Sequence, residues 1–339
     1  MKIIPSLISF ITFLLLLSCS EGKKYNAEIK GNTMGTYYII NIVDIPPRLN
    51  LEFIEKEIKK TLLQANSILS NWDEKSEISL LNNNQRIGAF KISNELKEVL
   101  KNANIINLKS EGYFDITLDP LIELWGFGYK KEKLEKIPAD HEINKTLLLI
   151  NQKKFVNIDE DKNEIYKKNK FLKLNLSAIG KGYGIDLIGR KLDALGLTNY
   201  LINIGGDLLT KGYNKKKQDW IIGVENPKLE EKMIKEIVNV TNKGIASSGD
   251  YKNFFMSNGK RYSHIINPKT GKPISHRTKS VTVISHNATY ADGWATALLA
   301  MGREKGLILA EKEKLAVLFI DEIDKKLIKF KSSEFKKLN

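Results

Sequence analysis

The sequence predicts an α+β fold, in which a mixed β-sheet is layered with helices. Segments with helical spacing of apolar residues are interspersed with short β-type segments, and the two do not alternate strictly. Glycine-rich and polar stretches follow several of the expected strands. The 339 residues suffice for one large domain or two ordinary ones. A layered α/β arrangement is the alternative.

The first residues are typical of an export signal. Lys2 precedes a mostly apolar stretch at residues 3–17, which is shorter than the about 20 residues a membrane-spanning helix needs. The run LLSC at residues 16–19 resembles the lipobox of bacterial lipoproteins, and Cys19 is the only cysteine. We expect a signal peptide at residues 1–18 and a tether at residues 19–29 that begins at lipidated Cys19. An ordinary secretory signal is the alternative.

A lipid anchor would place the protein on the periplasmic side of a bacterial membrane, most simply the inner one. The chain has 54 Lys and Arg against 40 Asp and Glu, a net charge of +14. Its lysines are scattered in surface-type runs without interleaved aromatic residues or a nucleic-acid-binding motif. We therefore expect no nucleic-acid partner, and an export signal argues against one too.

The N-terminal half predicts one strand and two helices before an aromatic-rich segment. Residues 37–43 form a strand that is entered through the turn-rich residues 31–36. Apolar residues at steps of three and four predict an amphipathic helix over residues 51–69. A second helix spans residues 94–109, with Ser93 as its cap. Residues 112–128 carry too many aromatic side chains for a plain loop.

The C-terminal half predicts a strand–turn–helix unit and then further strands and helices. The unit consists of a strand at residues 172–176, a turn at 180–182 and a helix that ends at Gly196. Asn258-Gly259 is a strong hairpin turn. The other expected strands are residues 200–204, 220–225, 254–256, 261–265, 281–285 and 315–321, and the other helices are 291–301 and 304–312. The folded domain would cover residues 30–325, followed by a basic tail at 326–339.

Residues 177–186, SAIGKGYGID, are a candidate phosphate site. Three glycines where a strand meets a helix let backbone amides approach an anion, and Lys181 adds a formal charge. A tight turn with a surface lysine is the alternative. Asp292 and Thr296 lie one helical turn apart and can point the same way. Asp292 at a helix start is often only a favourable dipole interaction, but one carboxylate can hold Mg²⁺ when a diphosphate supplies further oxygens.

His264, in the segment SHIINPKTG, can orient a phosphate or shuttle a proton. The alternative is an ordinary hairpin histidine. Four apolar or aromatic residues offer flat surfaces on which a ring can stack, although such residues more often belong to a core; they are Met34, Trp72, Tyr113 and Phe114.

Taken in order, these motifs resemble the ApbE family of flavin transferases over about residues 30–325. The matching segments are 33–36, 113–115, 119–120, 124–128, 177–186, 203–207, 248–251, 264–271 and 291–302. The resemblance implies the layered, T-fold-like α+β architecture of that family. It also implies an exported, often lipidated, Mg-dependent enzyme that cleaves FAD, joins FMN through a phosphoester to Thr or Ser of a target protein, and releases AMP.

The resemblance also assigns residues. It implies that FAD is held by Met34, Trp72, Tyr113, Phe114, Asp115, Asn175, Lys181 and Ile266. It implies that the metal is held by Asp292 and Thr296, with the helix turn at Ala295 and the backbone carbonyl of Ala178. Asn175 stands where members often carry Asp, and Lys181 where some carry an acidic residue.

The general base that activates the acceptor hydroxyl is Asp250 or His264, and Asp292 completes the candidate catalytic set. The chain has no acceptor segment of the type found in family targets. Its implied partners are therefore exported flavoprotein subunits of membrane redox complexes. Two other functions remain open: a periplasmic FAD pyrophosphatase that yields FMN and AMP, and a flavin-binding lipoprotein without catalysis. The metal-binding pair disfavours the pure binder.

Overall fold

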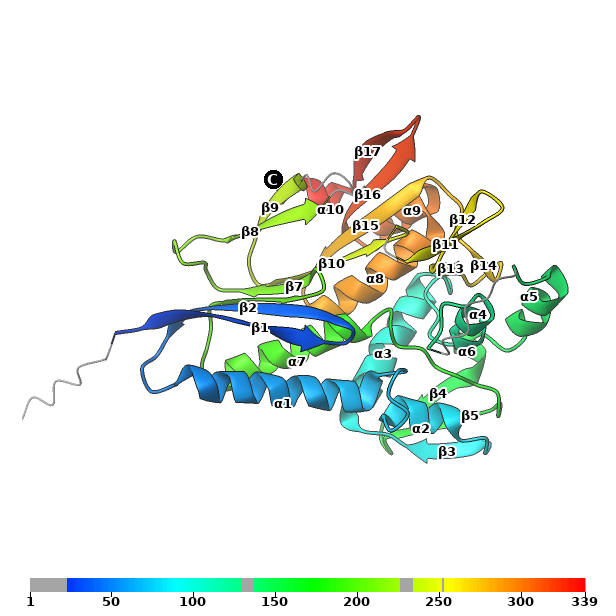
Figure 1. Cartoon of the computed structure of the whole chain (residues 1–339), viewed down its shortest axis with the longest axis horizontal. Helices are drawn as coiled ribbons and strands as arrows, with labels where there is room; N and C mark the ends of the chain where they lie inside the picture. The colour runs from blue at the N-terminus through cyan, green and yellow to red at the C-terminus, as the bar shows by residue number, and fades with distance from the viewer. Residues whose placement is uncertain (1–22, 130–136, 226–233, 252, 339) are drawn as a thin grey trace, which may run out of the picture.

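The computed structural model describes residues 23–129, 137–225, 234–251 and 253–338, and within them the chain forms an α+β fold around one large sheet (Figure 1). The described part of this sheet has eight strands. In spatial order they are β1 (Tyr25–Thr33), β2 (Thr36–Ile45), β6 (Tyr200–Ile204), β7 (Asp207–Lys211), β10 (Lys243–Gly249), β15 (Thr278–Ser285), β16 (Ala316–Ile323) and β17 (Lys326–Lys331). Each neighbouring pair is antiparallel, so the α+β class is confirmed and the sheet is antiparallel rather than mixed.

Helices cover one face of the sheet. The long helices are α1 (Leu51–Leu69), α3 (Asn94–Lys109), α7 (Gly180–Ala194) and α8 (Ala288–Met301), and α9 (Arg303–Lys312) follows α8. In Figure 1, α1 and α7 run side by side below β1 and β2. The helix α8 packs on β10 and β15, and Trp294 and Leu298 on it are fully buried. Among the described residues, no helix combines the length and apolar character needed to cross a membrane.

Smaller elements complete the fold. The opposite face of the sheet is covered by a hairpin of β8 (Trp220–Glu225) and β9 (Ile234–Val240) together with α10 (Ser333–Lys336). Two further hairpins are β11 (Phe254–Ser257) with β12 (Lys260–Ser263), and β13 (Ile266–Asn267) with β14 (Lys272–Pro273). A separate sheet has the order β3 (Gly88–Lys91), β5 (Glu164–Lys167), β4 (Val156–Asp159), and the short helices are α2 (Glu77–Asn83), α4 (Asp119–Leu124), α5 (Asp140–Leu147) and α6 (Gln152–Phe155).

Most of the expected elements form where they were predicted. The α1 and α3 helices have the predicted bounds, and Ser93 caps α3. At the β11–β12 turn, Asn258 and Gly259 both have positive φ, as the hairpin signal requires. The helix α8 starts three residues earlier than predicted, because Asn287 is its cap. Asp292 therefore lies in the second turn of α8, and a dipole interaction at the helix start does not account for it.

Both predicted ends of the domain are wrong. Residues 25–29, expected in the tether, are part of β1, which buries Ala27 and Ile29 against the helices. Residues 326–331, expected in a basic tail, form the edge strand β17, and Phe335 beyond it is fully buried. The lysines of β17 misled the prediction, because charged side chains are common on edge strands. The signal peptide, Cys19 and the first residues of the tether lie outside the described residues.

The strand predicted at residues 172–176 does not form. Side-chain amides, together with a bond from the Asn175 N–H to the Ile116 carbonyl at 2.7 Å, take the place of a neighbouring strand. Asn71 and Asn82 both donate to the Leu174 carbonyl, at 2.7 and 2.8 Å, and Asn82 Oδ1 accepts from the Leu174 N–H at 2.8 Å. The Leu176 N–H donates to Asn71 Oδ1 at 3.2 Å. Two buried asparagines therefore hold the segment that leads into α7.

Replacing Asn82 with Ala should lower the free energy of unfolding by about 2–4 kcal/mol, because two buried backbone groups of Leu174 lose a partner. Urea unfolding measures the change. Asn83→Ala on the same helix is the matched control, since Asn83 is exposed, and it should change stability by less than about 0.5 kcal/mol. Equal effects of the two substitutions would contradict this description of the segment.

His276 predicts a pH dependence of stability. Burial lowers the pKa of its imidazole, although the hydrogen bond with the Leu299 carbonyl, at 2.8 Å, opposes the shift. The unfolded chain then binds a proton more readily, so stability should fall as pH drops through about 6.5, the ordinary histidine value. Unfolding at pH 8 and pH 5 should show a smaller drop for His276→Asn than for the unchanged protein. Exposed His286 is the control position, and an equal drop in His276→Asn would rule this assignment out.

Candidate active site

Two adjoining cavities share walls from α4, α7 and the loop after β12. The helix α8 adds to the first cavity, and α1 and the β1–β2 turn add to the second. The first has a volume of about 210 Å³ and the second about 710 Å³. Both are lined by Ile122, Asn175, Ser177, Lys181 and His264, so the two cavities meet at these residues. The predicted site residues come from distant parts of the chain, and most of them line one or both cavities. The arrangement suits an elongated ligand with a polar middle.

The close approach of α7 and α8 builds the polar middle. A Cβ on Gly182 would lie 2.3 Å from the Ala288 carbonyl oxygen, so only glycine permits this contact. The Gly182 N–H donates to Asp292 Oδ2 at 3.0 Å. The N-terminus of α7 borders the second cavity through Gly180 and Lys181, and its dipole favours an anion there, although the Gly180 N–H already donates to the Leu176 carbonyl at 2.8 Å. The glycines therefore serve helix packing as well as the approach of a ligand.

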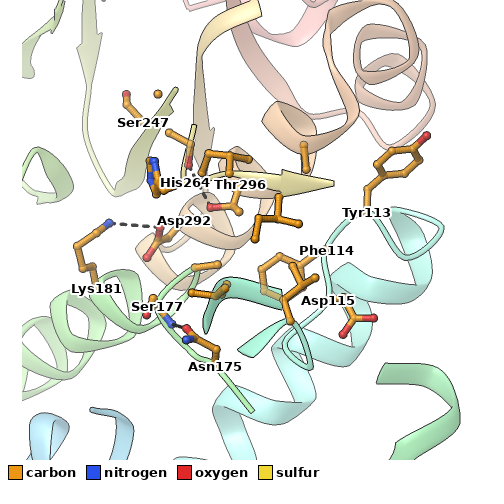
Figure 2. A pocket seen from close by; sticks show the side chains of 18 residues that line it. Tyr113, Phe114, Asp115, Asn175, Ser177, Lys181, Ser247, His264, Asp292 and Thr296 are labelled. Atoms are coloured by element: carbon orange, nitrogen blue, oxygen red, sulfur yellow. Dashed lines mark hydrogen bonds and ion pairs between the residues drawn. The ribbon is translucent and has the colours of Figure 1, made fainter. Parts of the chain in front are cut away.

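Lys181 lies between two carboxylates. Its ammonium donates to Asp207 Oδ2 and is 3.4 Å from Asp292 Oδ1, as Figure 2 shows for Asp292. Burial alone would lower the pKa of Lys181, but the two carboxylates outweigh it and raise the pKa, so the ammonium stays charged. Burial raises the pKa of Asp292, an effect that Lys181 opposes and Asp207 reinforces. Asp292 and Asp207 are 3% and 1% exposed, respectively.

Oxygen donors gather beside this lysine. Thr296, one turn after Asp292 on α8, faces the first cavity (Figure 2). Its hydroxyl is 3.1 Å from that of Ser248. Ala178 lines the same cavity and offers only backbone atoms as donors. Ala295 is fully buried, lines neither cavity and has no side-chain donor. Carboxylate, hydroxyl and carbonyl oxygens suit Mg²⁺.

The described residues contain no group of three or more His, Cys, Asp or Glu placed to hold a metal. A divalent cation at Asp292 would therefore need oxygens from its ligand as well. This requirement matches the chemistry of Mg²⁺ bound together with phosphates, where one or two carboxylates are sufficient. The donors present thus fit a magnesium ion that binds with a diphosphate.

Met34 and Trp72 line the second cavity. Met34 is in the β1–β2 turn with φ +50°, followed by Gly35 at +73°, a left-handed pair that turns the hairpin. A Cβ on Gly184 would lie 2.6 Å from Met34 Cε, so the methionine side chain packs against the backbone of α7 where Gly184 has no side chain. The indole of Trp72 is 66% exposed. An exposed large aromatic side chain at a cavity wall is available for stacking on a flat ring.

The segment 113–115 and Ile266 line the first cavity. Phe114 and Ile266 are buried and form apolar wall. Asp115 does not aim its carboxylate at the cavity: Oδ1 accepts from Thr117 and Oδ2 from the Gln152 N–H at 3.1 Å. Burial raises the pKa of Asp115, and these hydrogen bonds oppose the shift. Asp115 therefore shapes the loop rather than presenting free oxygens to a ligand.

Asn175 stands where the two cavities meet. Its Nδ2 donates to Asp119 Oδ1 at 3.0 Å, and its Oδ1 accepts from the Ser177 N–H at 3.1 Å. Asp119 is fully buried at the start of α4. Asp119 therefore places a carboxylate behind Asn175, although Asp119 itself lines neither cavity.

His264 and Asp250, the two candidate bases, have different surroundings. His264 lines both cavities, and its Nδ1 lies 2.8 Å from the Asn253 carbonyl oxygen. That contact assigns the ring proton to Nδ1 and makes Nε2 the basic nitrogen. Asp250 lines neither cavity, is 4% exposed, pairs with Arg261 and lies 3.6 Å from Lys279. Of the two, only His264 lines the cavities.

Sequence reasoning gave no individual role to Asp207, Ser177, Ser247, Ser248 or Asn253. Asp207 pairs with Lys181, and the other four line the cavities. Ser177 and Asp207 were indicated only by their position after the strands expected at residues 172–176 and 200–204. That signal does not show which of these side chains meet in space.

Comparison with known proteins agrees with this geometry. The sequence model described as the ApbE family matches residues 34–319. A FAD:protein FMN transferase of Vibrio cholerae is 34% identical over 330 residues, covering 97% of each chain. One from Haemophilus influenzae is 35% identical, covering 99% of this chain and 98% of its own.

Solved structures give the same answer. The flavin transferase ApbE from Vibrio cholerae superposes with a TM-score of 0.86 at 34% identity, covering 93% of this chain and all of the other. The apo form of the Pseudomonas stutzeri flavinyl transferase ApbE superposes with a TM-score of 0.85 at 30% identity, covering 94% and 98%. With its fold, its cavities and its sequence in agreement, this chain belongs to the ApbE family.

Proposed function

We propose that this protein is a FAD:protein FMN transferase. The observation that carries the proposal is the pair of adjoining cavities with Lys181, Asp292 and Thr296 where a diphosphate would lie. FAD has this shape, with a ring system at each end and a charged centre. The relatives that match nearly the full length of the chain have this name.

The reaction transfers a phosphoryl group. The acceptor hydroxyl oxygen forms a bond to the FMN phosphorus, the bond from that phosphorus to the bridging oxygen breaks, and AMP leaves with the bridging oxygen. Negative charge develops on the bridging oxygen and on the transferring group. The Lys181 ammonium and the dipole at the N-terminus of α7 stabilise that charge, because fixed charges in a partly buried site need little reorganisation.

The proposal also includes a magnesium ion. Asp292 and Thr296, with the Ala178 carbonyl, would hold the ion beside the diphosphate. When bound, it supplies positive charge to the phosphate oxygens. The residues of the chain do the remaining work: they bind the ring systems, position the diphosphate and take up the acceptor proton. His264 Nε2 is the proposed proton acceptor, since it is the basic nitrogen of the ring that lines both cavities.

The acceptors we propose are exported flavoproteins, in line with the export signal at residues 1–18. The protein would act on the periplasmic side of a bacterial membrane, held by lipid on Cys19. Replacing Cys19 with Ser should abolish incorporation of a labelled fatty acid and release the protein from the membrane fraction. If the Cys19→Ser protein still incorporated the labelled fatty acid and stayed in the membrane fraction, the result would contradict the lipid anchor at Cys19.

The test of the proposed activity is to incubate the purified protein with FAD, Mg²⁺ and a candidate flavoprotein acceptor. Mass spectrometry of the acceptor should show an added FMN on a Thr or Ser. Accumulation of FMN and AMP without an adduct on any acceptor would favour FAD pyrophosphatase activity. Unchanged FAD would favour a protein that binds flavin without catalysis.

A further inference from the structure

Asp207 is the acidic residue of the site whose role the function does not yet explain. It begins β7, is 1% exposed and lines neither cavity. Both of its oxygens are used inside the protein. Oδ1 accepts from the Ser247 N–H at 3.1 Å, and Oδ2 accepts from the Lys181 ammonium. Asp207 therefore links β10 to α7 from behind the site and would not contact a ligand in the cavities.

The Lys181 ammonium is shared unequally between its two carboxylates. It is bonded closely to Asp207 but is 3.4 Å from Asp292 Oδ1, beyond the about 2.7–2.9 Å of a strong charge-assisted hydrogen bond. The Lys181 side chain is 32% exposed and lines both cavities, whereas Asp207 and Asp292 are almost fully buried. Without Asp207, the ammonium would pair with Asp292 alone and compete for the carboxylate that a cation needs.

We propose that Asp207 is a positioning residue that acts through Lys181. It holds the ammonium off Asp292, so that this carboxylate can receive a divalent cation while the lysine remains directed at the diphosphate. The identity of these two ligands rests on the proposed function. The positioning of Lys181 is argued from its distances to Asp207 and Asp292.

Asp207 could instead attract a cation directly, because its negative charge acts through space. The two modes differ in their dependence on Lys181. A direct attraction persists when the lysine is removed. A positioning effect disappears, because there is then no ammonium to hold. A double-mutant cycle separates the two.

The experiment measures Mg²⁺ binding to the FAD-free protein by calorimetric titration at low salt. Asp207→Asn should weaken binding at least about tenfold, because the released Lys181 ammonium then pairs with Asp292. Lys181→Met should strengthen binding by a similar factor, because the cation that competes for Asp292 is gone. Asp207→Asn in the Lys181→Met background should have the affinity of Lys181→Met alone. Asp207→Glu keeps the charge and should restore affinity to within about threefold, and thermal unfolding confirms that each variant is folded.

The matched control is a second ion pair between the same two elements, Asp193 on α7 and Lys211 on β7, 2.7 Å apart. Asp193→Asn should leave Mg²⁺ affinity unchanged. The proposal is overturned if Asp207→Asn weakens binding equally in both backgrounds, if Lys181→Met weakens it, or if none of the forms binds Mg²⁺. The titration needs no acceptor and no turnover, so it stays informative if transfer itself fails.

Discussion

Asp292→Asn is expected to lower FAD turnover at least about 10²-fold, the size of effect seen when one preorganised charge-stabilising group is lost. The substitution keeps the shape of the side chain and an oxygen that can accept from the Gly182 N–H. It removes the negative charge that would hold a cation. The measurement is AMP release from FAD at saturating Mg²⁺.

Two comparisons make the Asp292 result interpretable. Asp193→Asn removes a carboxylate from an exposed part of α7 and should leave turnover unchanged. FAD binding, followed by flavin fluorescence, should weaken much less than turnover falls in Asp292→Asn. Turnover close to that of the unchanged protein would show that Asp292 does not hold the catalytic ion.

Gly182→Ala is expected to destabilise the protein by about 1–3 kcal/mol or more and to disrupt the site at the same time. The added Cβ would lie 2.3 Å from the Ala288 carbonyl oxygen and 2.8 Å from Thr289 Cα. These are backbone atoms, so α7 and α8 must separate. That movement would pull the Gly182 N–H away from Asp292.

Gly180→Ala, two residues earlier on the same helix, is the matched control. A Cβ there would meet only Leu69 Cδ1, at 4.0 Å, an ordinary contact. Alanine is also the better helix former, so stability should be unchanged or slightly higher. Thermal unfolding should separate the two glycines. Equal behaviour would mean that the close packing of α7 on α8 does not build the site.

The sequence predicted the long elements of the fold well, because periodic apolar residues and caps are local signals. The α1 helix and Ser93 at the start of α3 are examples. It failed at residues 172–176, where the partners of the backbone are the side chains of Asn71 and Asn82, about a hundred residues away in the chain. No local pattern announces such a pairing.

The candidate site shows the same division. Motif order identified Lys181, Asp292, Thr296 and His264, and the structure brings all four to the cavities. The role of Asp207 depends on the approach of β7 to α7, and the choice of His264 over Asp250 depends on the ion pair with Arg261. Both depend on tertiary contacts, which the sequence does not show. The sequence therefore pointed to these residues without separating their roles.

In the proposed function, the cavities position FAD for transfer of FMN to a protein hydroxyl rather than to water. The most direct measurement is the ratio of AMP released to FMN attached, determined on the same reaction with FAD, Mg²⁺ and acceptor in excess. The expected ratio is close to one, with no AMP release above background when the acceptor hydroxyl residue is replaced by Ala. Equal AMP release with and without that hydroxyl, and no attached FMN, would contradict it.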